Sequence, residues 1–197
     1  MAYKDLKLSD LQTKFGIAHQ RAQLFDTITP IAPSVWLQQA LEKSKLFPIK
    51  SEKAKSEFIV APILADIQER NQNTISIYSG EILNADKKLG LIGECDFILS
   101  KEPKSFDIKA PLISVIEAKK GDIELGIHQC AAQLVGLQKF NEKAKHPFKR
   151  VYGCVTNTDT WKFLKLEGSL ITIDIESYYL DNLPHILGIF QLMIDAS

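Results

Sequence analysis

The chain has 197 residues, of which 45% are hydrophobic and 24% charged, a composition typical of a single folded domain rather than a disordered or fibrous protein. Its 24 basic and 24 acidic residues cancel, so the net charge does not indicate an obligate nucleic-acid binder. The N-terminus lacks the apolar run of a secretory signal and no segment approaches the ~20 apolar residues of a membrane span, which predicts a cytoplasmic protein without a membrane partner.

The first 50 residues are expected to form a helical extension that packs on the remaining domain, residues 51–197. Ser9 and Ser34 are placed to cap helices over LQTKFGI and VWLQQALEK, and the proline-bearing ITPIAP separates them. The main domain begins with a helix in SEKAKSEFIVAPILADIQER, where apolar residues recur at helical spacing. Pro62 is expected to kink this helix or to displace its start.

From Thr74 onward the pattern changes to short β-rich segments. TISIYSGEIL, GLIGECDFILS and LISVIEAKK predict three strands in an antiparallel meander. A helix follows from about Asp122 to Lys143 with Asp122 as its N-cap, and further strands are predicted in RVYGCVTN, TWKFLKLEG and SLITIDI. The closing apolar helix in SYYLDNLPHILGIFQLMI completes the core or forms a homodimer face. This order predicts an α/β (α+β) fold with helices flanking a mixed sheet and a parallel crossover through the long helix.

Charged residues end one of these apolar strands. Glu117 and Lys119 are two positions apart, so strand alternation puts them on the same face. Asp96 lies within the preceding apolar strand, where a carboxylate is poorly solvated unless it is paired or bound to a cation. Hydrolysis of a phosphodiester needs a divalent cation on oxygen ligands and positive charge near the phosphate. Asp96, Glu117 and Lys119 meet that need, and Glu94 is an alternative to Asp96 as a ligand.

An Asp in one strand, then Glu-x-Lys at the end of the next and a helix after it, resembles the PD-(D/E)xK restriction-endonuclease-like nucleases. The match covers roughly residues 52–168, and VYGCVTNTDTWKFLKLEG is similar to a segment of the N-terminal nuclease domain of type I restriction motor subunits. The resemblance implies a restriction-endonuclease-like core that hydrolyses DNA with Mg²⁺, or with Mn²⁺ in its place, in restriction, defence or repair. It implies that Asp96, Glu117 and the Ala118 carbonyl hold the metal, while Lys119 positions the attacking water or the scissile phosphate.

The resemblance also implies roles for helical residues on both sides of the strands. Glu57, in the helix before them, is expected to contact the metal through water. Gln129, in the helix after them, is a candidate catalytic residue, and Gln133 shares its helical face. His128 is expected to be a surface or helix-packing histidine and Trp161 a core residue. Cys95, Cys130 and Cys154 are odd in number and widely spaced, which predicts buried thiols rather than zinc ligands or disulfides.

Basic residues flank this pattern on both sides, and the first 165 residues hold all 24 basic and 19 of the 24 acidic residues, a net charge of +5. Two runs are therefore candidates for phosphate contact: Lys43, Lys45, Lys50, Lys53 and Lys55, and Lys139, Lys143, Lys145, His146, Lys149 and Arg150. Two other interpretations stay open. A catalytically silent nuclease-fold module would bind nucleic acid or a protein partner, which agrees with the zero net charge. An unrelated α/β protein would use the acidic strand for an ordinary ion pair.

Overall fold

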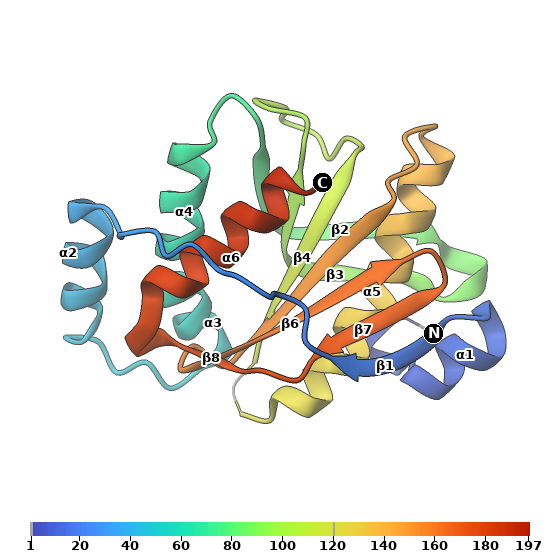
Figure 1. The fold of residues 1–197 in the computed structure, drawn as a ribbon, viewed down its shortest axis with the longest axis horizontal. Helices are drawn as coiled ribbons and strands as arrows, with labels where there is room; N and C mark the ends of the chain where they lie inside the picture. Colours follow the sequence, from blue (N-terminus) through green and yellow to red (C-terminus); the bar gives the residue numbers. More distant parts are fainter. Residues whose placement is uncertain (1, 120) are drawn as a thin grey trace.

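The computed structural model describes residues 2–119 and 121–197, which form an α/β fold around an eight-stranded mixed sheet (Figure 1). The strand order is β1-β7-β6-β5-β4-β3-β2, and β8 pairs with β6. The predicted meander of β2, β3 and β4 and the parallel crossover from β4 to β5 are both confirmed. The strands are β1 Ala18–Ala22, β2 Ser76–Asp86, β3 Leu91–Ser100, β4 Leu112–Ala118, β5 Arg150–Thr156, β6 Thr160–Glu167, β7 Leu170–Asp174 and β8 Tyr178–Tyr179.

Helices cover both faces of this sheet (Figure 1). On one face lie η1 Tyr3–Asp5, α1 Leu8–Phe15 and α5 Ile123–Lys143, and on the other lie α2 Val35–Ser44, α4 Ala61–Arg70 and α6 Leu183–Asp195. The shorter elements are α3 Glu52–Lys55, the π-helical turn η2 Ser56–Val60, η3 Lys87–Leu89 and η4 Leu180–Asn182. None of the helices within residues 2–119 and 121–197 combines the length and apolar character that crossing a bilayer requires.

Two of the three predicted N-caps are confirmed. The side chain of Asp122 accepts a hydrogen bond from Glu124 N at 2.8 Å at the start of α5, and that of Ser34 accepts one from Leu37 N at 3.1 Å at the start of α2. A side-chain oxygen in this position satisfies an amide that has no partner within the helix. The caps therefore fix where the long helix and the first helix of the opposite face begin.

The predicted cap at Ser9 is wrong, because α1 begins one residue earlier, at Leu8. The carboxylate of Asp10 accepts a hydrogen bond from Lys7 N at 3.0 Å, and this reversed contact stabilises the turn without a capping serine. His128 packs here as expected, since its Nδ1 accepts a hydrogen bond from Leu8 N at 3.4 Å.

The prediction that the first 50 residues are helical is wrong at β1. This strand pairs in parallel with β7 and so adds an edge to the central sheet. Its sequence, AHQRA, is mostly exposed and has no apolar alternation, so no local pattern indicated a strand. The pairing depends instead on a tertiary partner, β7, that is about 150 residues away in the chain.

Pro62 is the second residue of α4 and directly follows a π-helical turn and Ala61. The helical segment runs continuously through α3, η2 and α4, and η2 is a π-helical turn in which Ala61 N donates to Ser56 O. Proline has no amide hydrogen and clashes with the preceding turn, and the wider π turn before it accommodates the change. Turns of this kind often occur at functional sites.

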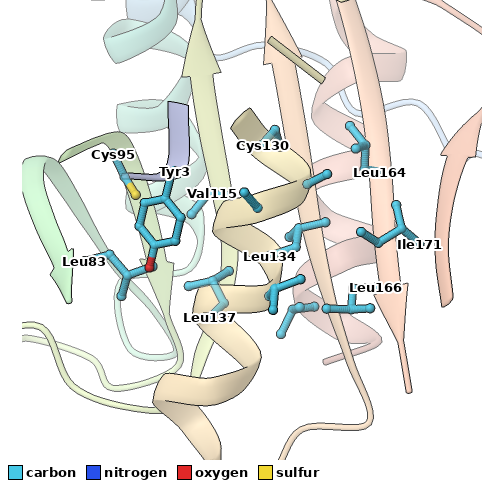
Figure 2. Close-up of a cluster of buried hydrophobic side chains, with 14 of the residues drawn as sticks. Tyr3, Leu83, Cys95, Val115, Cys130, Leu134, Leu137, Leu164, Leu166 and Ile171 are labelled. Carbon is cyan, nitrogen blue, oxygen red and sulfur yellow. The ribbon is translucent and has the colours of Figure 1, made fainter. Parts of the chain in front are cut away.

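Two hydrophobic clusters, one on each side of the sheet, make up the core. Figure 2 shows the cluster under α5, where the Tyr3 ring lies beside Cys95 and Leu83. Cys95, Cys130 and Cys154 are buried free thiols, as predicted. Trp161 is fully buried in the cluster on the opposite side, also as predicted.

The closing helix α6 belongs to that second cluster. Its apolar residues Ile186, Phe190 and Met193 are buried there. Of the two roles that the sequence allowed for this helix, the structure supports completion of the core.

Candidate active site

Asp96 lies where the regular alternation of side chains between the two faces of the sheet is interrupted in β3, next to Gly80 of β2. In β3, Cys95 packs in the cluster under α5 and Phe97 in the opposite cluster, although residues two apart normally share a face. Gly80 of β2 lies opposite Asp96 in the antiparallel register and has a φ of 69°. This left-handed conformation suits glycine because it has no Cβ. The reversal leaves the Asp96 side chain half-buried between the two sides of the sheet.

Glu117 lies on the α5 side of β4 and is only 1% exposed. Its Oε2 is 2.9 Å from both Lys119 Nζ and Gln129 Nε2, and its Oε1 accepts a hydrogen bond from Gln133 Nε2. Lys119 Nζ also donates to Gln129 Oε1 at 3.2 Å. Strand β4 thus brings Glu117 and Lys119 together, and α5 holds the pair in place through two glutamines.

Asp96 meets this group from β3. Its Oδ2 accepts a hydrogen bond from Ala118 N at 2.7 Å, so the carboxylate lies against the end of β4. Because the amide and carbonyl of one residue in an extended strand point to the same edge, the Ala118 carbonyl faces the same side. Asp96, Glu117, Ala118, Lys119 and Gln129, which the sequence singled out, are therefore neighbours in the structure.

The two carboxylates are held where ionisation is unfavourable. Burial raises the pKa of Asp96, and the negative charges of Glu52 and Glu94 raise it further. The hydrogen bond from Ala118 and the charge of Lys119 lower this pKa, but the net shift is upward. Burial also raises the pKa of Glu117, and so does the charge of Asp96. Desolvation disfavours a charged carboxylate, and a second carboxylate nearby adds repulsion. A cation close to both groups would relieve this cost.

Lys119 remains a cation in this environment. Burial alone lowers the pKa of its ammonium group, but the charge of Glu117 and their hydrogen bond outweigh burial and leave the pKa raised. A lysine with a raised pKa cannot serve as a base near neutral pH. It can instead donate hydrogen bonds and supply positive charge beside a phosphate.

A cavity of about 410 Å³ opens beside Asp96 on the side of α3. Asp96, Ala118 and Glu94 form its strand wall. Its helical wall, from α3 and η2, consists of Glu52, Lys53, Ser56 and Glu57. Glu117 is not among the lining residues and lies behind this wall on the α5 side. The cavity therefore gives solvent access to Asp96 but not to Glu117.

Two glutamates of the same helical segment, Glu57 and Glu52, lie where a glutamate was expected beside the metal. Glu57 lines the cavity, but its side chain is exposed and its Oε1 is 3.8 Å from Lys53 Nζ. Glu52, which the sequence analysis did not single out, also lines the cavity, and its charge raises the pKa of both Asp96 and Lys119. Glu52 is thus a helical carboxylate whose charge affects Asp96 and Lys119. In the sequence, the only signal for it was its position in the predicted helix.

In comparisons with protein-family models, curated proteins and solved structures, no match to the chain was found. The function has to be inferred from the residues of this site.

A second residue that the sequence analysis missed is Gly126, in the first turns of α5. A Cβ at this position would lie 2.5 Å from Val155 Cγ1 and 3.1 Å from Lys119 Cγ. Both distances are shorter than ordinary contacts, so only glycine lets α5 approach β4 and β5 this closely. The close approach is what brings Gln129 to Lys119 and Glu117. A glycine inside an otherwise helical pattern was the available signal.

The two basic runs differ in their relation to the cavity. Lys53 of the first run lines it, whereas Lys55 Nζ is held by the Asn157 carbonyl at 2.7 Å. In the second run, Lys149 Nζ and the Arg150 guanidinium lie 4.0 and 3.3 Å from Glu167. Carboxylates lie as close to lysines of the first run, since Glu57 is 3.8 Å from Lys53 Nζ and Glu42 is 2.6 Å from Lys45 Nζ. The first run is the better candidate for phosphate contact because Lys53 lines the cavity.

The oxygen atoms of this site suit a hard divalent cation. Asp96 Oδ1 takes part in none of the hydrogen bonds among the described residues, and three donors occupy three of the roughly four lone-pair positions of the Glu117 carboxylate. No cluster of three or more His, Cys, Asp or Glu side chains that could hold a metal occurs within residues 2–119 and 121–197. Mg²⁺ does not need such a cluster, since it is usually bound by one or two carboxylates and keeps several waters. Asp96, the Ala118 carbonyl and Glu117 fit that requirement.

Proposed function

We propose that this protein is a Mg²⁺-dependent nuclease that hydrolyses DNA phosphodiester bonds and that its sheet is a restriction-endonuclease-like core. The observation that carries the proposal is that Asp96 of β3 contacts the end of β4, where Glu117 and Lys119 form an ion pair. Two carboxylates that a divalent cation can share and one lysine that stays charged are the groups that phosphodiester hydrolysis needs.

In this proposal each residue has a separate task. Asp96, the Ala118 carbonyl and Glu117 would hold the cation, which when bound polarises the phosphate and makes a bound water more acidic. Lys119 donates hydrogen bonds to the phosphate or the attacking water and offsets the negative charge that develops. Gln129 holds Lys119 and Glu117 in their relative positions through its amide. Gln133 supports the other oxygen of Glu117.

One observation favours a second candidate, a nuclease-fold module that binds nucleic acid or a protein partner without cleaving. Glu117 is almost fully buried, both of its oxygens accept hydrogen bonds, and the cavity does not reach it. A carboxylate fully satisfied by Lys119, Gln129 and Gln133 could serve only to hold Lys119. The two candidates therefore differ in whether Glu117 binds a cation.

A comparison of two variants tests the proposal. The wild type should cleave plasmid or oligonucleotide DNA with Mg²⁺ or Mn²⁺. Lys119→Met should abolish cleavage while calorimetry still detects metal binding, because the oxygen ligands remain. Glu117→Gln should lose both, because a neutral amide replaces a charged ligand.

Lys109→Met is the matched control, since Lys109 is exposed in the loop between β3 and β4, at the far end of these strands from Ala118. It should cleave like the wild type. A wild type that neither cleaves DNA nor binds either cation would contradict the nuclease proposal and favour the silent module.

A further inference from the structure

Several large hydrophobic side chains are exposed at the two ends of α2. Ten such residues are exposed in the described chain, and four of them lie in residues 35–47: Val35, Trp36, Leu46 and Phe47. Single exposed hydrophobic residues are ordinary, but a concentration of them usually marks a surface that binds something. The loop that follows α2 leads directly into α3, which carries residues of the cavity (Figure 1).

Phe47 in this loop has the geometry of a stacking platform. Its ring lies parallel to that of Phe58, with 4.4 Å between the centroids and 16° between the planes. Phe58 is itself partly buried in η2, so the pair is anchored to the helical segment. Phe58 covers one face of the Phe47 ring, yet 49% of Phe47 remains exposed. An anchored ring with an exposed surface can accept another planar group.

Lysines lie on both sides of Phe47 in the sequence, and one of them lines the cavity. Residues 42–58 contain five lysines and three glutamates. Lys43 and Lys50 are exposed and form no ion pair among the described residues, and Lys53 lines the cavity. Phe58 directly follows Glu57, which also lines it. An aromatic ring, exposed lysines and an acidic cavity are therefore carried by one short segment of the chain.

We infer that Phe47 with Lys43, Lys50 and Lys53, here called the Phe47 platform, binds an unpaired DNA strand, with one base stacked on the Phe47 ring and the phosphates on the lysines. The inference rests on the proposed function and specifies its substrate class: a single strand, or the frayed end of a duplex. A base within a duplex is already stacked on both faces and offers none to the ring. Sequence-tolerant binders of single strands combine aromatic stacking with a basic groove in the same way.

The excess of lysine over glutamate decides against a protein partner as the first choice, because phosphates complement it and an apolar protein surface does not. The position of the platform also determines the direction in which the bound strand extends. A strand stacked at Phe47 and held at Lys53 would extend into the cavity that Asp96 lines, because Lys53 lines the same cavity.

The test measures DNA binding in the presence of EDTA, so that it does not depend on cleavage. Fluorescence anisotropy should show that the wild type binds a single-stranded oligonucleotide more tightly than the matching duplex. Phe47→Leu keeps an apolar side chain but removes the aromatic face, and it should weaken single-strand binding by about 5- to 150-fold, the range expected for one stacked base. Phe47→Trp keeps an aromatic face and should bind the single strand with the affinity of the wild type. Phe106→Leu is the control, because Phe106 is fully exposed in the loop between β3 and β4, and it should change nothing.

A second readout reports stacking directly and does not depend on affinity. An oligonucleotide carrying the fluorescent base 2-aminopurine should lose emission when that base stacks on the wild-type protein and keep it with Phe47→Leu. Equal affinity for single strand and duplex, unchanged binding by Phe47→Leu, or a Phe47-dependent dimer in sedimentation would each overturn the inference. Tight, Phe47-dependent binding by a wild type that does not cleave would instead contradict the nuclease proposal and leave the platform in place.

Discussion

Replacing Gly126 with alanine would put a methyl group into the contact between α5 and the two strands that support the site. That methyl carbon would lie 2.5 Å from Val155 Cγ1 and 3.1 Å from Lys119 Cγ. Val155 is fully buried in β5 and, as a β-branched residue, has little rotamer freedom to move away. The helix or the Lys119 side chain must therefore shift.

Two opposing effects set the change in stability. Glycine to alanine within a helix gains about 1 kcal/mol from helix propensity. Overpacking a buried contact costs about 1–3 kcal/mol, and the rigidity of Val155 places this contact in the upper half of that range. The free energy of unfolding should fall by about 1–2 kcal/mol, which for a domain of this size corresponds to a decrease in Tm of about 2–8 °C.

The rate of DNA cleavage should fall by more than the modest loss of stability would suggest, because the shift displaces Lys119 from Glu117 and Gln129. A catalytic group misplaced by about 1 Å can lose about 100-fold in rate. Thermal unfolding and DNA cleavage well below the Tm would be measured together, with Gly121→Ala as the control, since its Cβ meets no atom within 4 Å. An alanine variant that gains about 1 kcal/mol and cleaves normally would refute the reasoning.

Three further outcomes follow from the described contacts. Because burial raises the pKa of Glu117, the folded protein keeps a proton that the unfolded chain releases. The stability contributed by this group is therefore full below its ordinary pKa and is lost as pH rises through the raised value. Urea unfolding at several pH values should show a smaller dependence of the unfolding free energy on pH in Glu117→Gln than in the wild type, and an equal dependence would contradict this. Asn141→Ala should cost about 2–4 kcal/mol in the same assay, because the buried amide holds both Leu112 N and Leu112 O at 2.7 Å. Lys53→Glu should weaken DNA binding and lower its salt dependence by about one phosphate contact, whereas Lys109→Glu should not, and equal effects would remove Lys53 from the binding surface.

Elements with local signals could be predicted from the sequence. The N-cap Asp122, the apolar spacing that follows it and the alternating strands before it depend on residues close together in the chain, so α5 and the β2–β4 meander were found. Glu117 and Lys119 were found for the same reason, because a strand places residues two apart on one face. Their contact at 2.9 Å is a local consequence of that geometry.

The remainder depends on contacts between distant segments. β1 is defined only by its pairing with β7, and the choice between Glu52 and Glu57 depends on the π-helical turn that changes the direction of the residues after Lys55. The positive φ of Gly80, which accompanies the reversal at Asp96, leaves no mark on a hydrophobic pattern. Glycine was visible at this position, but its backbone conformation was not.

The most direct test of the central claim is the position of a bound metal ion. Crystals of the wild type grown with Mn²⁺ should show an anomalous density peak at the end of β4, coordinated by Asp96 and the Ala118 carbonyl, and the peak should weaken in Asp96→Asn. The Glu117 carboxylate should contact the same ion or one of its waters. Diffraction data collected at saturating Mn²⁺ that show no peak beside Asp96, with Glu117 still bound only to Lys119, Gln129 and Gln133, would contradict the account.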